Sequence, residues 1–149
     1  AVKMILSYYG IDATEDELCV KCGHTFEKGC TDRGMIKAFQ SYGLSAKIFN
    51  NCSIQDIEYW IRHHVPVIVD YFAGGTSVDI MPDGHSGIIV DIDKEAVYLL
   101  DPWSAKVLTI YREDFIRVWF DFRDSHIYSW KDMVLRQLIV AYPKKLNIR

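Results

Sequence analysis

The sequence has few of the features that mark membrane-spanning, nucleic-acid-binding or disulfide-rich proteins. It contains no apolar run of about 18 residues or more, so we expect no helix that crosses a membrane and no membrane contact. Its net charge is −3 and its basic residues are scattered, which gives no reason to expect a nucleic acid partner. Four cysteines do not make a disulfide scaffold in a chain of 149 residues, and we therefore expect reduced thiols and a cytoplasmic location.

What the sequence does contain is typical of a globular protein. Half of the residues are hydrophobic and a quarter are charged, and the chain is long enough to bury a sizeable core. No repeat, linker or low-complexity segment divides it, which predicts a single domain over residues 1–149. Because Ala1 already lies inside a helical pattern, we expect this domain to be truncated at its N-terminus.

Helical patterns dominate the first half of the chain, and strand patterns dominate the second. The predicted helices cover residues 2–9, 14–22, 32–42, a segment opening at 53–56, and a short one at 113–120. The predicted strands cover residues 44–49, 66–72, about 86–92, 96–100, 106–111 and 135–142, with a loop over 73–84. This order predicts an α+β domain whose N-terminal helices pack on an antiparallel sheet.

Two polar residues lie at the ends of apolar strand patterns. His85 precedes the strand that starts at Ser86, and Asp101 follows Leu100 and precedes Pro102. Their spacing suits a strand, a turn and a returning strand, which would bring the imidazole beside the carboxylate. Such a histidine can take a proton from a thiol while the carboxylate holds its tautomer. Taken alone, however, the histidine is more often structural and the Asp-Pro pair more often a turn.

An ordered set of short motifs resembles the bacteriocin-processing cysteine peptidases, which cleave after double-glycine leaders, and their papain-like relatives. The motifs are Met4-Ile5-Leu6-Ser7-Tyr8-Tyr9-Gly10-Ile11, Thr14-Glu15-Asp16-Glu17-Leu18, Gly29, Gly34-Met35, Tyr42-Gly43-Leu44-Ser45-Ala46, Val65-Pro66-Val67-Ile68-Val69, Gly84-His85, Asp101-Pro102, Phe115 and Trp119.

This resemblance implies a papain-like fold that hydrolyses a peptide or protein substrate without a cofactor. It makes His85 and Asp101 the catalytic histidine and aspartate, and Gly84 and Trp103 flank them as expected substrate contacts. The family's Cys-Gly pair and an oxyanion-stabilising glutamine would precede Ala1, so we expect this chain alone to be inactive. Papain-like folds also host acyl transferases, and the reaction class therefore rests on the resemblance.

Other interpretations of the sequence stay open. The domain could be a non-catalytic papain-like module that binds a peptide in the same cleft. Cys22-Gly23 is the one Cys-Gly pair in the chain, but it is expected near a helix C-terminus, where a thiolate is disfavoured.

A zinc site formed by Cys19, Cys22, His24 and Cys30 is a further alternative. All four residues lie within one short segment, whereas zinc sites usually join two ligand pairs across a turn. We therefore favour packed cysteines and expect no metal.

Overall fold

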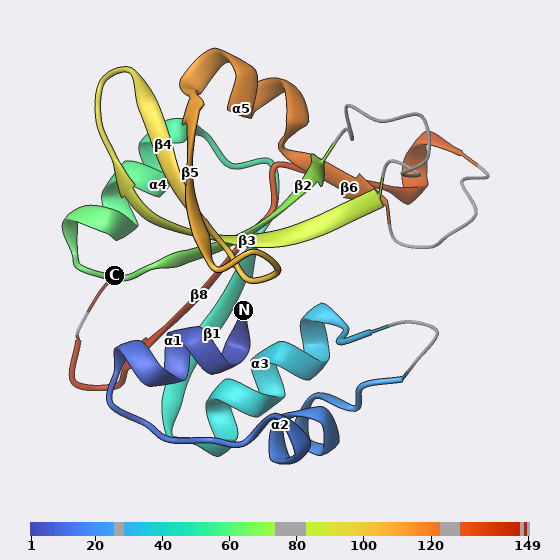
Figure 1. Cartoon of the computed structure of the whole chain (residues 1–149), viewed down its shortest axis with the longest axis vertical. Coiled ribbons are helices and arrows are strands. Elements are labelled where there is room, and N and C mark those ends of the chain that lie inside the picture. The colour runs from blue at the N-terminus through green and yellow to red at the C-terminus, as the bar shows by residue number, and fades with distance from the viewer. Residues whose placement is uncertain (26–28, 74–82, 123–128, 147, 149) are drawn as a thin grey trace. The chain divides into compact units, whose positions relative to one another are not determined.

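The computed structural model describes residues 1–25, 29–73, 83–122, 129–146 and 148 (Figure 1). The chain forms two compact units. The first unit consists of Ala1–Ile48 and Ile139–Arg149, and the second consists of Phe49–Leu138. Within the described residues, no helix is long and apolar enough to cross a membrane.

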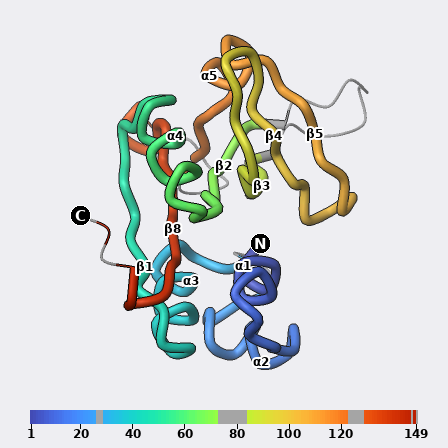
Figure 2. Tube along the Cα trace, turned by 90° about the vertical axis from the view of Figure 1, so that its left-hand side faces the viewer, coloured from blue at the N-terminus to red at the C-terminus, as the bar shows by residue number. Residues whose placement is uncertain are grey.

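The first unit contains three helices, which contact one another, and it also contains two strands that lie next to each other (Figure 2). These elements are α1 (Val2–Tyr8), α2 (Glu15–Cys22), α3 (Asp32–Ser41), β1 (Leu44–Phe49) and β8 (Leu138–Pro143). The Thr14 hydroxyl accepts a hydrogen bond from the Glu17 amide, and the Glu17 carboxylate accepts one from the Thr14 amide, so α2 begins with the predicted capping box.

The second unit is built on four antiparallel strands with two helices against them (Figure 1). Its strands β2 (Val67–Ala73), β3 (Asp83–Ile92), β4 (Ala96–Asp101) and β5 (Lys106–Tyr111) lie side by side in that order. Helix α4 (Ile54–Arg62) contacts β2 and β3, and helix α5 (Arg112–Val118) contacts β2, β4 and β5. A small ribbon of β6 (Phe120–Phe122) and β7 (Met133–Leu135), with a 3-10 turn at Trp130–Asp132, completes the unit.

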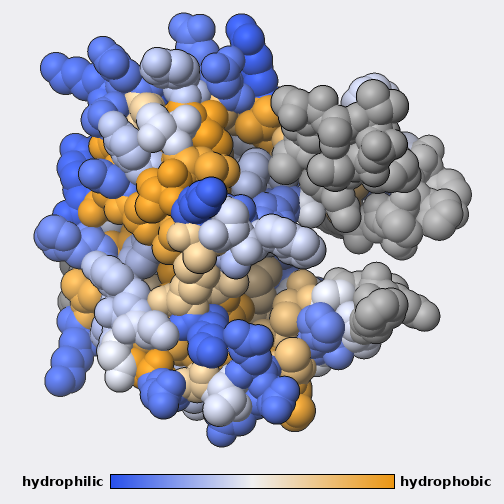
Figure 3. Space-filling view, in the orientation of Figure 1, coloured by the Kyte–Doolittle hydropathy of each residue, from blue (hydrophilic) through white to orange (hydrophobic). Residues whose placement is uncertain are grey.

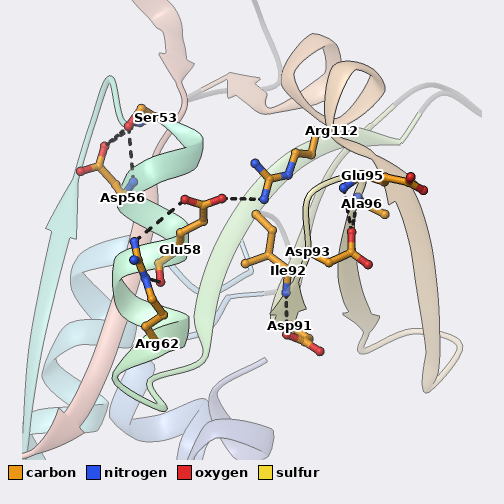
Figure 4. A network of polar contacts seen from close by, with 10 residues as sticks. All are labelled: Ser53, Asp56, Glu58, Arg62, Asp91, Ile92, Asp93, Glu95, Ala96 and Arg112. Atoms are coloured by element: carbon orange, nitrogen blue, oxygen red, sulfur yellow. Dashed lines mark hydrogen bonds and ion pairs between the residues drawn. The ribbon is translucent and has the colours of Figure 1, made fainter.

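Polar contacts hold the end of the β3–β4 hairpin and join α4 to α5 (Figure 4). The Asp93 carboxylate accepts hydrogen bonds of 2.8 Å from the amides of Glu95 and Ala96, which fixes the turn between β3 and β4. Arg112 Nη2, at the start of α5, donates to Glu58 Oε1 of α4 at 2.5 Å. The hairpin that carries His85 and Asp101 is therefore anchored at its far end.

The predicted α+β class is confirmed, and the helices of the first half lie close to their predicted ranges. The predicted loop over 73–84 is wrong at its end, because β3 already begins at Asp83 and so includes Gly84 and His85. Residues 74–82 of that loop lie outside the described part of the chain.

The predicted last strand, 135–142, is also wrong in its bounds. It corresponds to two strands, β7 and β8, separated around Arg136, whose φ is +46°. Strand β6 was not predicted, since a strand of three residues is too short to show a period.

Candidate active site around His85 and Asp101

Strand pairing brings His85 and Asp101 into contact. In the β3–β4 register Ile88 pairs with Leu100, which puts Asp101 at the end of β4 near His85 of β3. His85 Nε2 lies 2.5 Å from Asp101 Oδ1, a hydrogen-bonding distance. The His85 side chain is 30% exposed and that of Asp101 is 13% exposed. A solute can therefore reach the imidazole, while the carboxylate behind it is largely covered.

The turn after β4 holds the Asp101 carboxylate in place. The amide of Trp103 donates to Oδ1 at 3.0 Å, and Ser104 donates to Oδ2 through its amide at 3.1 Å and its hydroxyl at 2.7 Å. Burial by itself would raise the pKa of Asp101, but the hydrogen bonds from His85, Ser104 and the Trp103 amide outweigh it and hold the pKa below its usual range. The group is therefore a fixed carboxylate at neutral pH.

The hydrogen bond between His85 and Asp101 also decides which nitrogen of His85 is available to accept a proton. Nε2 faces Asp101, and Nδ1 has no partner among the described residues. In the neutral ring that donates from Nε2, Nδ1 is the lone-pair nitrogen. It can accept a proton from a nucleophile.

Tyr71 is a contact of His85 that sequence reasoning did not single out as such. It lies opposite His85 in the β2–β3 register, and the two rings meet edge to face with centroids 5.6 Å apart. Burial, and then the negative charge of Asp101, raise the pKa of Tyr71 to about 12, so the phenol stays neutral. The sequence suggested either core or cleft for this residue, and only the strand register identifies it as a packing partner of the imidazole.

The two expected substrate contacts differ in their surroundings. At Gly84, an added β-carbon would lie 1.9 Å from Oδ1 of Asp121 in β6, so the glycine allows this close approach. Packing thus accounts for Gly84, and its contact with substrate stays a prediction. Trp103 is 89% exposed in the turn directly after Asp101, and its contact with substrate is likewise a prediction.

The buried cysteines of the chain are poorly suited to act as the thiolate nucleophile of a peptidase. Burial raises the pKa of Cys22 to about 12 and that of Cys52 to about 11, so both thiols keep their protons at neutral pH. Across the described ranges, no group of three or more His, Cys, Asp or Glu residues could hold a metal ion. The alternative of a zinc site therefore has no observation in its favour.

Solved structures of C39 peptidase domains share this fold. The peptidase domain of Streptococcus ComA, a bifunctional ABC transporter involved in a quorum-sensing pathway, is 17% identical with a TM-score of 0.69, over 96% of this chain and 88% of that one. A double-glycine-motif protease from an AMS/PCAT transporter, in complex with its leader peptide, is 20% identical with a TM-score of 0.60, over 95% and 80%. A putative C39-like peptidase from Bacillus anthracis is 17% identical with a TM-score of 0.65, over 96% and 86%.

Sequence comparison agrees with this likeness in fold. The comparison with curated proteins gave no significant match. Residues 1–127 match the Peptidase_C39 like family. This match covers most of the chain and confirms the resemblance seen in the motifs. The chain therefore belongs to the Peptidase_C39 like family.

Proposed function

We propose that this protein hydrolyses peptide bonds by a Cys-His-Asp mechanism, with His85 as the base and Asp101 as its orienting carboxylate. The observation that carries the proposal is the hydrogen bond between His85 Nε2 and Asp101 Oδ1, in a chain of a peptidase family. In this proposal the nucleophilic cysteine precedes Ala1, at the start of a helix that continues as α1, as the resemblance implies. A helix N-terminus favours a thiolate.

The Nδ1 atom of His85 defines the order of proton transfers. Nδ1 takes the thiol proton, and the thiolate attacks the peptide carbonyl carbon. The imidazolium then gives that proton to the leaving amine, which departs and leaves a thioester. Water, deprotonated by Nδ1, cleaves the thioester and releases the acid and the thiol. Throughout, the carboxylate of Asp101 stabilises the imidazolium and keeps its Nδ1 edge directed at the reacting atoms.

Exposed apolar side chains in the turn after Asp101 and along β5 support a peptide as the substrate. Trp103 is followed by β5, on which Val107, Leu108 and Tyr111 are all exposed. Figure 3 shows apolar surface over β4 and β5. Contiguous apolar surface is typical of binding sites. One structure of similar fold holds a leader peptide, which is consistent with a peptide ligand here.

Thiol labelling of the protein expressed from its own start codon tests the proposal. Iodoacetamide is added over a range of pH, and the labelled cysteines are mapped by mass spectrometry. We expect fast labelling at neutral pH of one cysteine other than Cys19, Cys22, Cys30 and Cys52. That fast labelling should be lost in His85→Ala.

His63→Ala is the matched control, because His63 is exposed and its ring contacts the Tyr59 carbonyl oxygen instead of a carboxylate. Fast labelling that survives in His63→Ala and disappears in His85→Ala would support the peptidase. Uniformly slow labelling of every cysteine would overturn catalysis. It would favour the second candidate, a papain-like module that binds peptides through the same exposed surface without cleaving them.

A further inference from the structure

The end of α2 and the segment leading into α3 bring two cysteines together. Helix α2 ends at Cys22, where Gly23 adopts the left-handed conformation with a φ of +64°. Thr25 and Gly29 then pair through two backbone hydrogen bonds of 3.2 and 2.8 Å, so the chain turns back on itself. Cys30 follows Gly29 directly and is thereby returned to the end of α2.

Contacts with α3 hold Cys22 in this place. A β-carbon on Gly34 would lie only 2.0 Å from the carbonyl oxygen of Cys22, so the first turn of α3 lies directly against the end of α2. Near the other end of α3, Lys21 Nζ donates to Ser41 Oγ at 3.3 Å and lies 4.1 Å from the centre of the Tyr42 ring. The position of Cys22 is therefore set by packing at both ends of α3.

The β-carbon position of Gly34 lies 2.0 Å from the Cys22 carbonyl oxygen and 3.2 Å from Oγ1 of Thr31, the residue after Cys30, so the two cysteines are close together. They differ in exposure. Cys22 is 3% exposed, whereas Cys30 is exposed. Burial, together with the nearby Cys30 thiol, raises the pKa of Cys22 to about 12, so Cys22 keeps its proton. An oxidant in solution thus reaches Cys30 first, and Cys22 is the thiol in contact with whatever product forms there.

We propose that Cys22 and Cys30 form an oxidation site that hydrogen peroxide converts into a disulfide. The Cys30 thiolate attacks the peroxide O–O bond and becomes a sulfenic acid, while hydroxide leaves and takes up the proton that Cys30 lost. The Cys22 sulfur then attacks the sulfenic sulfur, and its own proton leaves with the displaced hydroxide as water. With hydrogen peroxide, two thiols and one peroxide give one disulfide and two waters. Neither cysteine takes part in the proposed peptidase reaction, so this site is independent of it.

Peptide mapping of the oxidised chain tests this site. The reduced, folded chain is treated with hydrogen peroxide, the remaining thiols are alkylated, and the protein is digested with trypsin without reduction. Trypsin puts the four cysteines on separate peptides, residues 4–21, 22–28, 29–33 and 48–62. We expect one main crosslinked product, which joins 22–28 to 29–33 and disappears on addition of a thiol reductant.

The same crosslink should raise the melting temperature of the chain. A disulfide between these positions closes a short loop and restricts the unfolded chain. We therefore expect the oxidised protein to melt about 5–10 °C above the reduced one. Cys30→Ser should lose both the crosslink and the shift. Cys19→Ser, which removes an exposed thiol one turn earlier in α2, should keep both.

Three results would overturn the proposal. The first is a main crosslink that involves peptide 4–21 instead of the pair 22–28 and 29–33. The second is oxidation of Cys30 to a sulfinic or sulfonic acid in the folded chain without a crosslink to Cys22. The third is the same distribution of crosslinks in the folded chain and in urea, where the fold no longer directs pairing.

Discussion

The acid dependence of stability measures how firmly the fold holds Asp101 as a carboxylate. Its pKa in the folded chain is lowered, because hydrogen bonds from His85 and Ser104 outweigh the effect of burial, which alone would raise it. The unfolded carboxyl has an ordinary pKa of about 3.9. A lowered folded-state pKa stabilises the fold above that value, and this stabilisation is lost as the pH falls toward the folded-state pKa.

The size of this loss follows from proton uptake. Between about pH 5 and about pH 3 the unfolded chain binds a proton at this position while the folded chain does not, which costs the fold at most about 1.2 kcal/mol. Solvent at the partly exposed His85–Asp101 pair screens the charge, so we expect about 0.6–1.2 kcal/mol.

Asp101→Asn isolates this contribution, because the variant has no carboxyl to titrate at that position. The free energy of unfolding is measured by urea denaturation, followed by tryptophan fluorescence, at both pH values. Wild type should lose about 0.6–1.2 kcal/mol more than the variant on acidification. Asp12→Asn, at an exposed carboxyl, should lose as much as wild type. Equal losses for wild type and Asp101→Asn would refute the idea that the turn holds Asp101 ionised.

Two further predictions concern the packing of each unit. Gly34→Ala should destabilise the chain by about 1–3 kcal/mol in urea denaturation, because the added β-carbon would lie 2.0 Å from a backbone oxygen of α2; an unchanged urea midpoint would contradict this close approach. Arg112→Met should cost more stability alone than in combination with Glu58→Gln, because the single change leaves the half-buried Glu58 carboxylate with the exposed Arg62, 4.0 Å away, as its ion-pair partner. A double-mutant cycle should give a coupling energy of about 0.5–3 kcal/mol, and a coupling near zero would mean that the ion pair does not join α4 to α5.

Helix starts could be predicted from the sequence because their signals lie within a few adjacent residues. Ser53 and Asp56 form a capping box by themselves, with the Ser53 hydroxyl accepting from the Asp56 amide and the Asp56 carboxylate accepting from the Ser53 amide. Helix α4 accordingly begins at Ile54. No information from elsewhere in the chain is needed for such a motif.

The short ribbon of the second unit could not be predicted, because contacts distant in sequence produce it. Phe120 pairs with Leu135 across a long segment, and its ring stacks on Phe72 of β2 with centroids 5.2 Å apart. Three residues of β6 carry no periodic signal, and their extended conformation depends on the partners that they meet. The close approach of Asp121 to Gly84 belongs to the same class of contact.

The candidate site combines a feature that could be predicted from the sequence with one that depends on distant contacts. The contact between His85 and Asp101 could be predicted from the sequence, because the sequence shows two apolar strands and the turn between them. Which ring nitrogen faces the carboxylate depends on the exact placement of the β4 end, and the structure assigns that place to Nε2. Because Asp101 occupies Nε2, a thiol that gives its proton to His85 must approach the Nδ1 edge of the ring. Any cysteine that cannot reach that edge is thereby excluded as the nucleophile, whatever its position in the sequence.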